Sequence, residues 1–328
     1  MKHHITRLTL CYTLLILLGS CQYKELYYEQ DDWADVTVGF DWQHAPDMEP
    51  GGMTVLFYRE GMGTPERYDF AGRQGGKARL QSGTWQAVAY NYDTETILYR
   101  GMESLATLEA YTRYSSIEEG TQLTRAGMPR AVGTEEEPVI LEPDPLCAAA
   151  GSAFQLLMGQ GANVTIAPQM RTEEVVITIH DVPNLQYCTG FGGALSGLAP
   201  SVFIDSGIAS EGKATEAFPG RVIDDTTLEF RVRIFGHCPD GDHGDQNAHL
   251  LTVYVMLADG SKWYYTADVS SLMHGGQGGQ GGQGGGPLGD DTIAIDIDDL
   301  PIPKPIVNGS GFQPTIDGWQ GIEINVDM

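Results

Sequence analysis

The sequence predicts an all-β protein built from two tandem antiparallel β-sandwich domains. Many short segments alternate apolar and polar residues, as half-buried strands require. Turns rich in Gly, Pro and Asp separate these segments, and few stretches show helical periodicity. The chain has 328 residues, which is enough for two domains of roughly 100–200 residues each. Short strands at regular spacing with few helices favour two sandwiches in series.

In the first half, the clearest strand is expected at 36–42, where Val36, Val38 and Phe40 share one face. A Pro-rich step at 142–146 follows the last strand of this half. We place the domain boundary there, which gives one sandwich over 35–143 and a second over 144–328. The other strands expected in the first sandwich lie at 53–60, 84–92, 96–101 and 138–143.

In the second half, a hairpin is expected around Asp259-Gly260, because Gly supplies the positive φ of a tight turn. The Gly-rich stretch 189–200 fits neither a phosphate-binding loop nor a nucleophile elbow, and we interpret it as a bend between strands. Two stretches, 105–116 and 146–159, could be helical. The strands expected in this half lie at 174–182, 228–236, 250–260, 262–269, 292–300 and 322–328.

The Gly/Gln-rich segment 275–286 has no side chains to bury. Its twelve residues would span roughly 20 Å as a flexible coil. Because it lies between two expected strands, we interpret it as an expanded loop of the second sandwich.

The N-terminus has the parts of a bacterial lipoprotein signal. Lys2 and Arg7 give the first residues a positive charge. The apolar run 8–18 that follows is shorter than the ~20 residues of a transmembrane helix. Gly19 and Ser20 then precede Cys21, a pattern that resembles a lipobox. We therefore expect a signal peptide over 1–20, lipid attachment at Cys21 and a tether over 21–34. The alternative is an ordinary signal peptide with an incidental cysteine.

The charge of the chain argues against binding to nucleic acid. It carries 44 Asp and Glu against 19 Lys and Arg, which gives a net charge of −25. Such a surface repels phosphate backbones. The acidity is better explained by the solubility of an exported surface protein.

Three cysteines remain after Cys11 leaves with the signal and Cys21 is lipidated. An exported protein can form disulfides, so Cys188 and Cys238 are a candidate pair, which leaves Cys147 over. The alternative is that all three are small buried apolar residues. No C-x-x-C motif is present, which argues against a zinc ribbon or a thioredoxin-like site.

The strongest candidate for chemistry is the polar cluster 237–249. His237, Asp240, Asp242 and His243 form a weak candidate metal site, since imidazole and carboxylate groups can bind zinc or calcium. The spacing matches neither an EF-hand loop nor H-E-x-x-H. We therefore prefer a polar turn between two strands, and we expect no metal, no cofactor and no catalytic residues.

Five segments of the chain carry a resemblance to a known family: 21–42, 51–61, 83–101, 192–202 and 318–328. Together they resemble a family of Bacteroidetes lipoproteins similar to the fimbrillin-like minor subunits, the Mfa-like and FimB-like anchor proteins. The resemblance implies two transthyretin-like, Greek-key sandwiches, attachment to the outer membrane through Cys21, exposure at the cell surface and no catalytic residues. The acids after Cys21 resemble an export signal to the outer face. The segment 275–286 and the cluster 237–249 depart from the family pattern.

The first functional hypothesis is a minor or anchoring subunit of a fimbria, or an adhesin with ligands on host or microbial surfaces. Fimbrial subunits can associate by β-strand addition, and the terminal segment 322–328 is a candidate to donate or seal a sheet edge. For an anchor, we expect this segment to stay in its own domain. Asp225-Thr226 and Asp291-Thr292 also resemble O-glycosylation sites of this bacterial group, with sugar on Thr226 and Thr292.

The second hypothesis is a glycan-binding surface lipoprotein of a polysaccharide-uptake system. It predicts that Trp42, Trp85 and Trp263 gather on one outer face, whereas their burial favours the fimbrial interpretation. An enzyme is the third hypothesis, and only the cluster 237–249 supports it.

Overall fold

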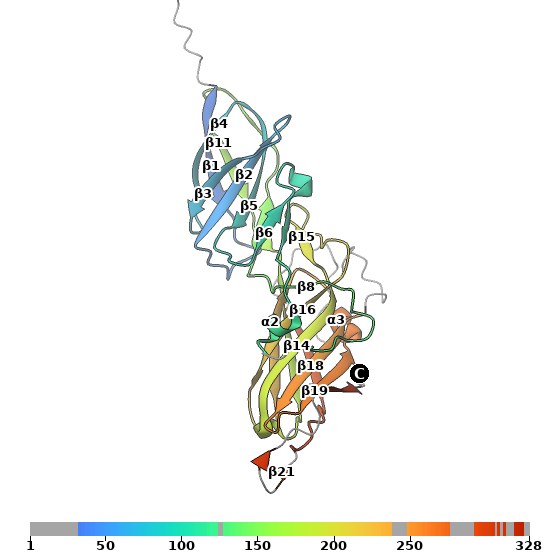
Figure 1. Ribbon diagram of the computed structural model, residues 1–328. Coiled ribbons are helices and arrows are strands. Elements are labelled where there is room, and N and C mark those ends of the chain that lie inside the picture. The colour runs from blue at the N-terminus through green and yellow to red at the C-terminus, as the bar shows by residue number, and fades with distance from the viewer. Residues whose placement is uncertain are drawn as a thin grey trace, which may run out of the picture.

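The computed structural model describes residues 32–123, 127–237, 248–275, 292–305, 307–308, 311–312 and 318–324. Figure 1 shows an elongated molecule in which an N-terminal and a C-terminal half are stacked end to end. Both halves are built almost entirely from strands, and each encloses its own apolar cluster. The predicted all-β sandwich architecture is confirmed.

The N-terminal half is a sandwich of two sheets. Its smaller sheet has the order β11-β1-β4, with parallel pairing of β1 to β11 and antiparallel pairing to β4. Its larger sheet has the order β12-β9-β5-β2-β3, and β10 pairs with β5 beside it. The strands are β1 (Trp33–Phe40), β2 (Gly52–Arg59), β3 (Glu66–Ala71), β4 (Gly76–Gln81), β5 (Gly83–Asn91), β9 (Cys147–Ala150), β10 (Phe154–Leu156), β11 (Ala162–Ile166) and β12 (Gln169–Met170).

Both faces of the larger N-terminal sheet are buried. On β2, Val55 and Phe57 point into the sandwich core, whereas Leu56 between them points to a second apolar cluster on the opposite face. This second cluster is covered by a third, small sheet of the order β15-β7-β6. Its strands are β6 (Leu98–Arg100), β7 (Glu109–Tyr111) and β15 (Ser201–Phe203), and the 3-10 turn η1 (Leu105–Thr107) precedes β7.

The C-terminal half is one long sheet that curls over its own core. The order is β20-β13-β17-β16-β14-β18-β19-β23, with the short β8 beside β16. Strand β16 pairs with β14 up to Pro219 and with β17 from Gly220 onward, so the sheet changes direction at this dipeptide. The strands are β8 (Val139–Ile140), β13 (Glu173–His180), β14 (Cys188–Leu198), β16 (Ala214–Val222), β17 (Leu228–Ile234), β18 (Leu250–Leu257), β19 (Lys262–Asp268), β20 (Ile293–Asp298) and β23 (Trp319–Ile324).

Short helices and turns complete the C-terminal half. Helix α2 (Ile117–Thr121) begins at Ser116, whose hydroxyl accepts a hydrogen bond from the Glu119 amide at 3.1 Å. The predicted hairpin is confirmed, since β18 and β19 are joined through Gly260 with φ +82°. The remaining elements are η2 (Leu185–Tyr187), α3 (Ser270–Gly275), β21 (Val307–Asn308) and β22 (Gly311–Phe312).

The Gly-rich stretch 189–200 is a strand and not the predicted bend. It forms most of β14, which lies between β16 and β18. The glycines are needed for close packing on both faces: a Cβ on Gly192 would lie 2.5 Å from Thr121 Cβ, and one on Gly193 would lie 2.3 Å from Phe218 Cε2. Gly192 and Gly193 therefore serve close packing, whereas Gly197 supplies a φ of +76° where the register of β14 shifts.

Both predicted helices are also wrong. The stretch 146–159 contains β9 and β10, and 105–116 contains η1 and β7. The Ala run of β9 favours a helix by propensity, but Cys147 and Ala149 face one core while Ala148 faces the other. Small side chains on both faces are what this sheet position requires, so tertiary packing overrides the propensity.

Strand pairing does not follow the boundary expected between 143 and 144. Strands β9 to β12, which lie within 147–170, all complete the N-terminal sheets. Conversely, α2 and β8 come earlier in the chain and pack on β16 of the C-terminal half. The physical reason is the parallel pair β1–β11, which brings the chain back to the first sandwich after a long crossover.

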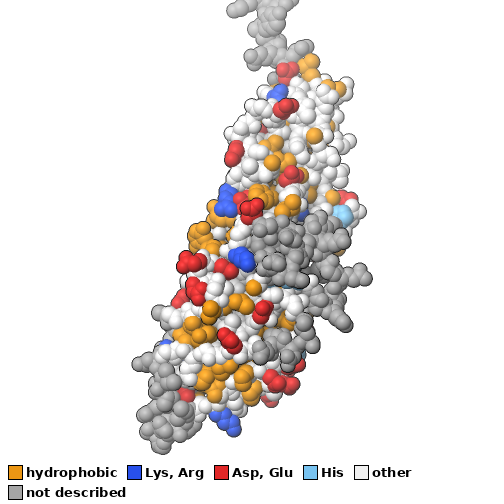
Figure 2. Space-filling model, turned by 90° about the vertical axis from the view of Figure 1, so that its right-hand side faces the viewer, with side chains coloured by type: hydrophobic (Ala, Val, Ile, Leu, Met, Phe, Trp, Pro, Cys, Tyr) orange, Lys and Arg blue, Asp and Glu red, His pale blue; other side chains and the backbone are white. Residues whose placement is uncertain are grey.

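Acidic side chains are spread along the whole length of the molecule on the face shown in Figure 2. Among the described residues, no helix has the length and apolar character to cross a membrane.

The close packing of β14 generates a stability prediction. Gly193→Ala should lower the free energy of unfolding by about 1–3 kcal/mol, because the new methyl group overlaps the fully buried Phe218 ring. The matched control is Gly39→Ala in β1, where a Cβ has open space within 4 Å and should be tolerated. Urea denaturation of both variants measures the difference. Equal effects of the two changes would contradict the proposed reason for glycine in β14.

Candidate attachment and assembly surfaces

The first described strand, β1, is held on both of its edges. The register runs from Val36 opposite Ala162 to Phe40 opposite Ile166 on the β11 side, while Trp33 to Val38 pair with β4. The side chains of Ala34, Val36 and Val38 are buried in the sandwich core. The described chain begins at the end of the N-terminal half that lies away from the C-terminal half (Figure 1). A force applied to the chain before β1 would therefore meet two hydrogen-bonded ladders and a buried face.

The last described strand, β23, closes one end of the C-terminal sheet. It pairs in parallel with β19 from Lys262 opposite Trp319 to Ala267 opposite Ile324. Ile322 and Ile324 are half-buried against the core, whereas Glu323 between them is exposed. Terminal residues 319–324 thus stay in their own domain, as predicted for an anchor. The rest of the segment, 325–328, lies outside the described residues.

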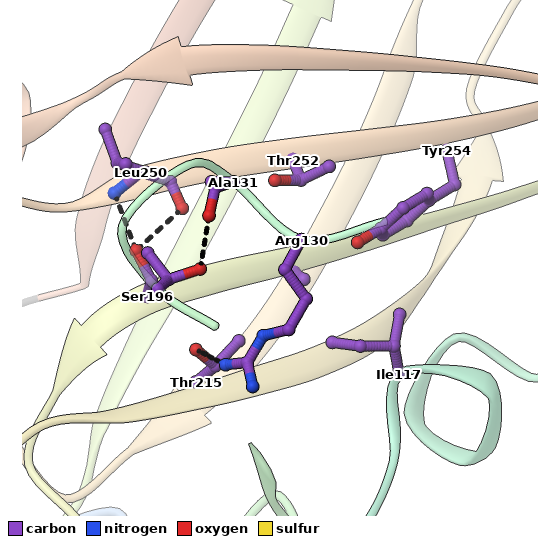
Figure 3. A pocket seen from close by; sticks show the side chains of 10 residues that line it. Ile117, Arg130, Ala131, Ser196, Thr215, Leu250, Thr252 and Tyr254 are labelled. Atoms are coloured by element: carbon purple, nitrogen blue, oxygen red, sulfur yellow. Dashed lines mark hydrogen bonds between the residues drawn. The ribbon is translucent and has the colours of Figure 1, made fainter. Parts of the chain in front are cut away.

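A strap formed by residues 127–138 crosses the outer face of β14, β16 and β18. Figure 3 shows the small pocket beneath it, with Arg130 and Ala131 of the strap facing Ser196, Thr215 and Thr252 of the sheet. The Arg130 guanidinium donates to Thr215 Oγ1 at 2.8 Å and to the carbonyl of Glu137 at 2.6 Å.

Two further contacts fix this strap. The Tyr254 hydroxyl donates to the Pro129 carbonyl at 2.6 Å. A carboxylate oxygen of Glu137 accepts from Thr215 Oγ1 at 2.9 Å and from the Gly197 amide at 3.1 Å. The outer face is thus occupied by the chain itself and is not an open groove for a partner.

A polar network lies at the junction of the two halves. Arg100 donates two hydrogen bonds of 2.6 Å to the buried Glu109. The Ser201 hydroxyl also donates to Glu109 and lies 2.6 Å from Ser210 Oγ. The hydrogen bonds from Arg100 hold the pKa of Glu109 below its usual range, in spite of burial. Ser201 is 92 positions from Glu109, so sequence spacing gave no signal for this network.

A buried glutamate side chain, that of Glu216, lies inside the C-terminal half. Glu216 on β16 has no exposed surface, and neither carboxyl oxygen has a hydrogen-bond partner among the described residues. Burial, reinforced by the neighbouring Glu142, raises the pKa of Glu216 well above its usual range. The carboxyl group is therefore kept neutral by its surroundings.

The family described as a domain of unknown function, DUF5119, matches residues 20–218 of this sequence. The chain belongs to this family. A Bacteroides ovatus protein with the name "Putative fimbrium anchoring subunit Fim4B" is 26% identical over 334 residues, which cover 96% of this chain and 95% of that protein. The resemblance to fimbrillin-like proteins of Bacteroidetes is thus confirmed for the DUF5119 chain.

A solved structure shares the fold of this DUF5119 protein. A crystal structure of a Bacteroides ovatus protein described as an adhesin is 20% identical, with a TM-score of 0.57, and the match covers 83% of this chain and 94% of that one. The fimbrial anchor protein Mfa2 of Porphyromonas gingivalis gives a lower TM-score of 0.48 at 13% identity, over 81% and 90% of the two chains.

The predicted cysteine sites of the DUF5119 chain are only partly described. Cys21 and Cys238 lie outside the described residues, so lipid attachment and the Cys188–Cys238 disulfide stay predictions. Cys188 is half-buried at the start of β14, with its sulfur 3.7 Å from the Asn184 carbonyl. Burial raises the pKa of Cys147 and of Cys188 to about 12, so neither side chain is an activated thiolate.

Of the weak candidate metal site, only His237 lies in the described part of the chain. Its Nδ1 is 3.1 Å from a carboxylate oxygen of Glu173, whereas Asp240, Asp242 and His243 fall outside the described residues. As placed, the described His, Cys, Asp and Glu side chains include no group of three or more that could hold a metal ion.

The two predicted glycosylation sites are exposed. Thr226 lies in the turn between β16 and β17, where its amide donates to Asp224 Oδ1 at 2.8 Å. Thr292 directly precedes β20, and its neighbour Asp291 lies outside the described residues. Accessibility is compatible with modification, which stays a prediction.

The tryptophans do not form a common outer face. Trp85 is 1% exposed in the N-terminal core, and Trp42 is half-buried beside it, with Nε1 donating to the Arg73 carbonyl at 2.9 Å. Trp263 is half-buried against the core of the other half. This arrangement favours the fimbrial over the glycan-binding hypothesis.

The buried acids generate a pH prediction. Because the pKa of Glu216 is raised on folding, its contribution to stability is full below its unfolded pKa and is lost as pH rises. Glu216→Gln removes this loss, so the free energy of unfolding of the variant should rise relative to that of the wild type between pH 4 and pH 8. Urea denaturation across this range measures the difference.

Glu109→Gln is the matched comparison, with the opposite sign. The lowered pKa of Glu109 gives stability above its unfolded pKa that is lost as the pH falls through the folded value. Glu109→Gln should therefore have a lower free energy of unfolding than the wild type at neutral pH. The difference should become smaller in acid. A Glu216→Gln variant whose difference from the wild type did not change with pH would disprove the assignment.

Proposed function

We propose that this chain is a non-catalytic surface lipoprotein that anchors a fimbria to the outer membrane through Cys21. The relative named as a fimbrium anchoring subunit aligns with the chain over nearly its whole length. The DUF5119 match begins at residue 20, directly before the proposed lipid site. An adhesin role for the same surface protein is a variant of this proposal, supported by the related fold of a protein described as an adhesin.

The observation that carries the proposal is the position of β1. Only the tether separates Cys21 from this strand, which is paired on both edges and buried on one face. An edge strand could peel away one hydrogen bond at a time, whereas β1 must lose both ladders and its core contacts. Several acyl chains on Cys21 would supply a stable membrane attachment. Load on the fimbria would then pass from the lipid directly into the N-terminal core.

The opposite end of the chain supplies a route to other subunits. In this proposal, partner subunits associate by β-strand addition, in which main-chain hydrogen bonds extend an open sheet edge. Strand β23 is the last in its sheet order, and β20 is at the other end of that order. Since the lipid on Cys21 would hold the N-terminal half at the membrane, we place subunit contact on the C-terminal half.

Lipid attachment is tested by Cys21→Ala. The variant should leave the membrane fraction and should lack acyl chains by intact-mass measurement, because only the thiol of residue 21 can form the thioether. Cys188→Ala is the control and should stay in the membrane fraction. An acylated, membrane-bound Cys21→Ala protein would overturn the proposed attachment.

The role of β23 is tested by Ile322→Asp combined with Ile324→Asp. Charge at these half-buried positions should lower the free energy of unfolding by about 2 kcal/mol or more and release β23 from β19. Co-purification with fimbrial subunits from envelope extracts should then be lost. Glu323→Gln, on the exposed side of the same strand, should preserve both properties. If deletion of 322–328 left folding and association intact, the assignment of this strand would fail.

A further inference from the structure

Three histidine rings meet at one end of the C-terminal sheet. His237 follows β17, His249 directly precedes β18, and His274 lies in α3. The ring centroids are 4.9 Å apart for His249 and His274, 5.6 Å for His237 and His274, and 6.1 Å for His237 and His249. These residues are far apart in sequence, and the fold alone brings them together.

The spacing matches what a shared metal ion requires. Zinc binds imidazole nitrogen at about 2.0–2.1 Å in tetrahedral geometry, which places the centroids of any two coordinating rings about 5 Å apart. The three observed distances lie close to this value. The rings are tilted by 46° to 63° with respect to one another and are not stacked.

His249 is the fixed member of the cluster. It has no exposed surface, and its Nδ1 lies 3.2 Å from the Ser196 carbonyl. If Nδ1 carries the proton toward that carbonyl, Nε2 has a free lone pair. Nε2 is buried and has no hydrogen-bond partner in the described part of the chain.

His237 is oriented by an acid. Its Nδ1 lies 3.1 Å from Glu173 Oε2, and both side chains are mostly buried. A carboxylate bonded to the second nitrogen of a metal-binding histidine fixes the ring and raises its basicity. His274 is held on α3, whose Met273 is buried in the C-terminal core.

We propose that His237, His249 and His274 bind one transition-metal ion of the zinc class, with Glu173 as a positioning residue. Three imidazoles are borderline-soft donors, which suit zinc and related ions and not calcium or magnesium. The rings as placed do not yet meet the requirements of a bound ion. Movement of the His274 side chain, which is half-buried, toward Nε2 of His249 would close the site, while Glu173 keeps His237 in place. The fourth position is left to water or another oxygen donor.

Such an ion would join three elements of the C-terminal half. It would tie the end of β17 and the start of β18 to α3, which follows β19. The inference is independent of lipid attachment and of fimbrial assembly, and it adds a ligand to the C-terminal half. An ion bound only to the folded chain also raises the melting temperature.

The test is titration of the full chain with zinc alone, by isothermal titration calorimetry after treatment with a chelator. The wild type should bind one equivalent at this site, and zinc should raise the melting temperature. His237→Gln, His249→Gln and His274→Gln should each weaken that binding by about 100-fold or more. His180→Gln is the control, since His180 lies on β13 beside Asp296 and outside the cluster.

Glu173→Gln separates positioning from folding. It should weaken zinc binding by about tenfold, with the circular dichroism spectrum unchanged and with partial recovery in Glu173→Asp. If His249→Gln does not fold, zinc binding by His237→Gln and His274→Gln, at less buried positions, still tests the proposal. Absence of zinc binding by the wild type, or unchanged binding in His237→Gln and His274→Gln, would overturn the proposal.

Discussion

The parallel pairing of β1 with β11 is the constraint on which the rest of the structure depends. It joins the first strand of the fold to one that lies more than a hundred residues later, and it can form only after the intervening chain has left the N-terminal half and returned. The crossover carries α2 and β8 onto the outer side of β14 and β16 before β9 re-enters the larger N-terminal sheet. Such non-local contacts are slow to form.

Burial of both faces of the larger N-terminal sheet couples the two halves. The cluster on its outer face includes Leu56 and Val88 of that sheet, Val202 of β15 and Phe235, which follows β17 of the C-terminal half. The buried Glu109 lies beside it, with its charge compensated by Arg100 and Ser201. Apolar contact joins the two halves here, and the ion pair adds directional bonds between β6 and β7 of the small sheet that covers this cluster.

Much of the fold could be predicted from the alternation of apolar and polar residues, but the pairing and order of the strands could not. Strands such as β1 and β13 bury one face, and the alternation in their sequence predicts them. β9 and β14 were missed because small residues serve packing on both faces, a need that only the neighbouring strands reveal. The cluster 237–249 drew attention to His237, but His274 joins it through the fold of α3, which spacing in the sequence does not encode.

The chain passes between the two halves more than once, and this has a consequence for how the gene can evolve. Residues 147–170 belong to one half and residues 117–140 to the other, so no single cut in the gene yields two intact modules. Recombination at any one point would leave both products with sheets lacking strands. The two halves must therefore diverge together, and a change of partner specificity has to arise by substitution within loops and edges and not by exchange of a whole domain.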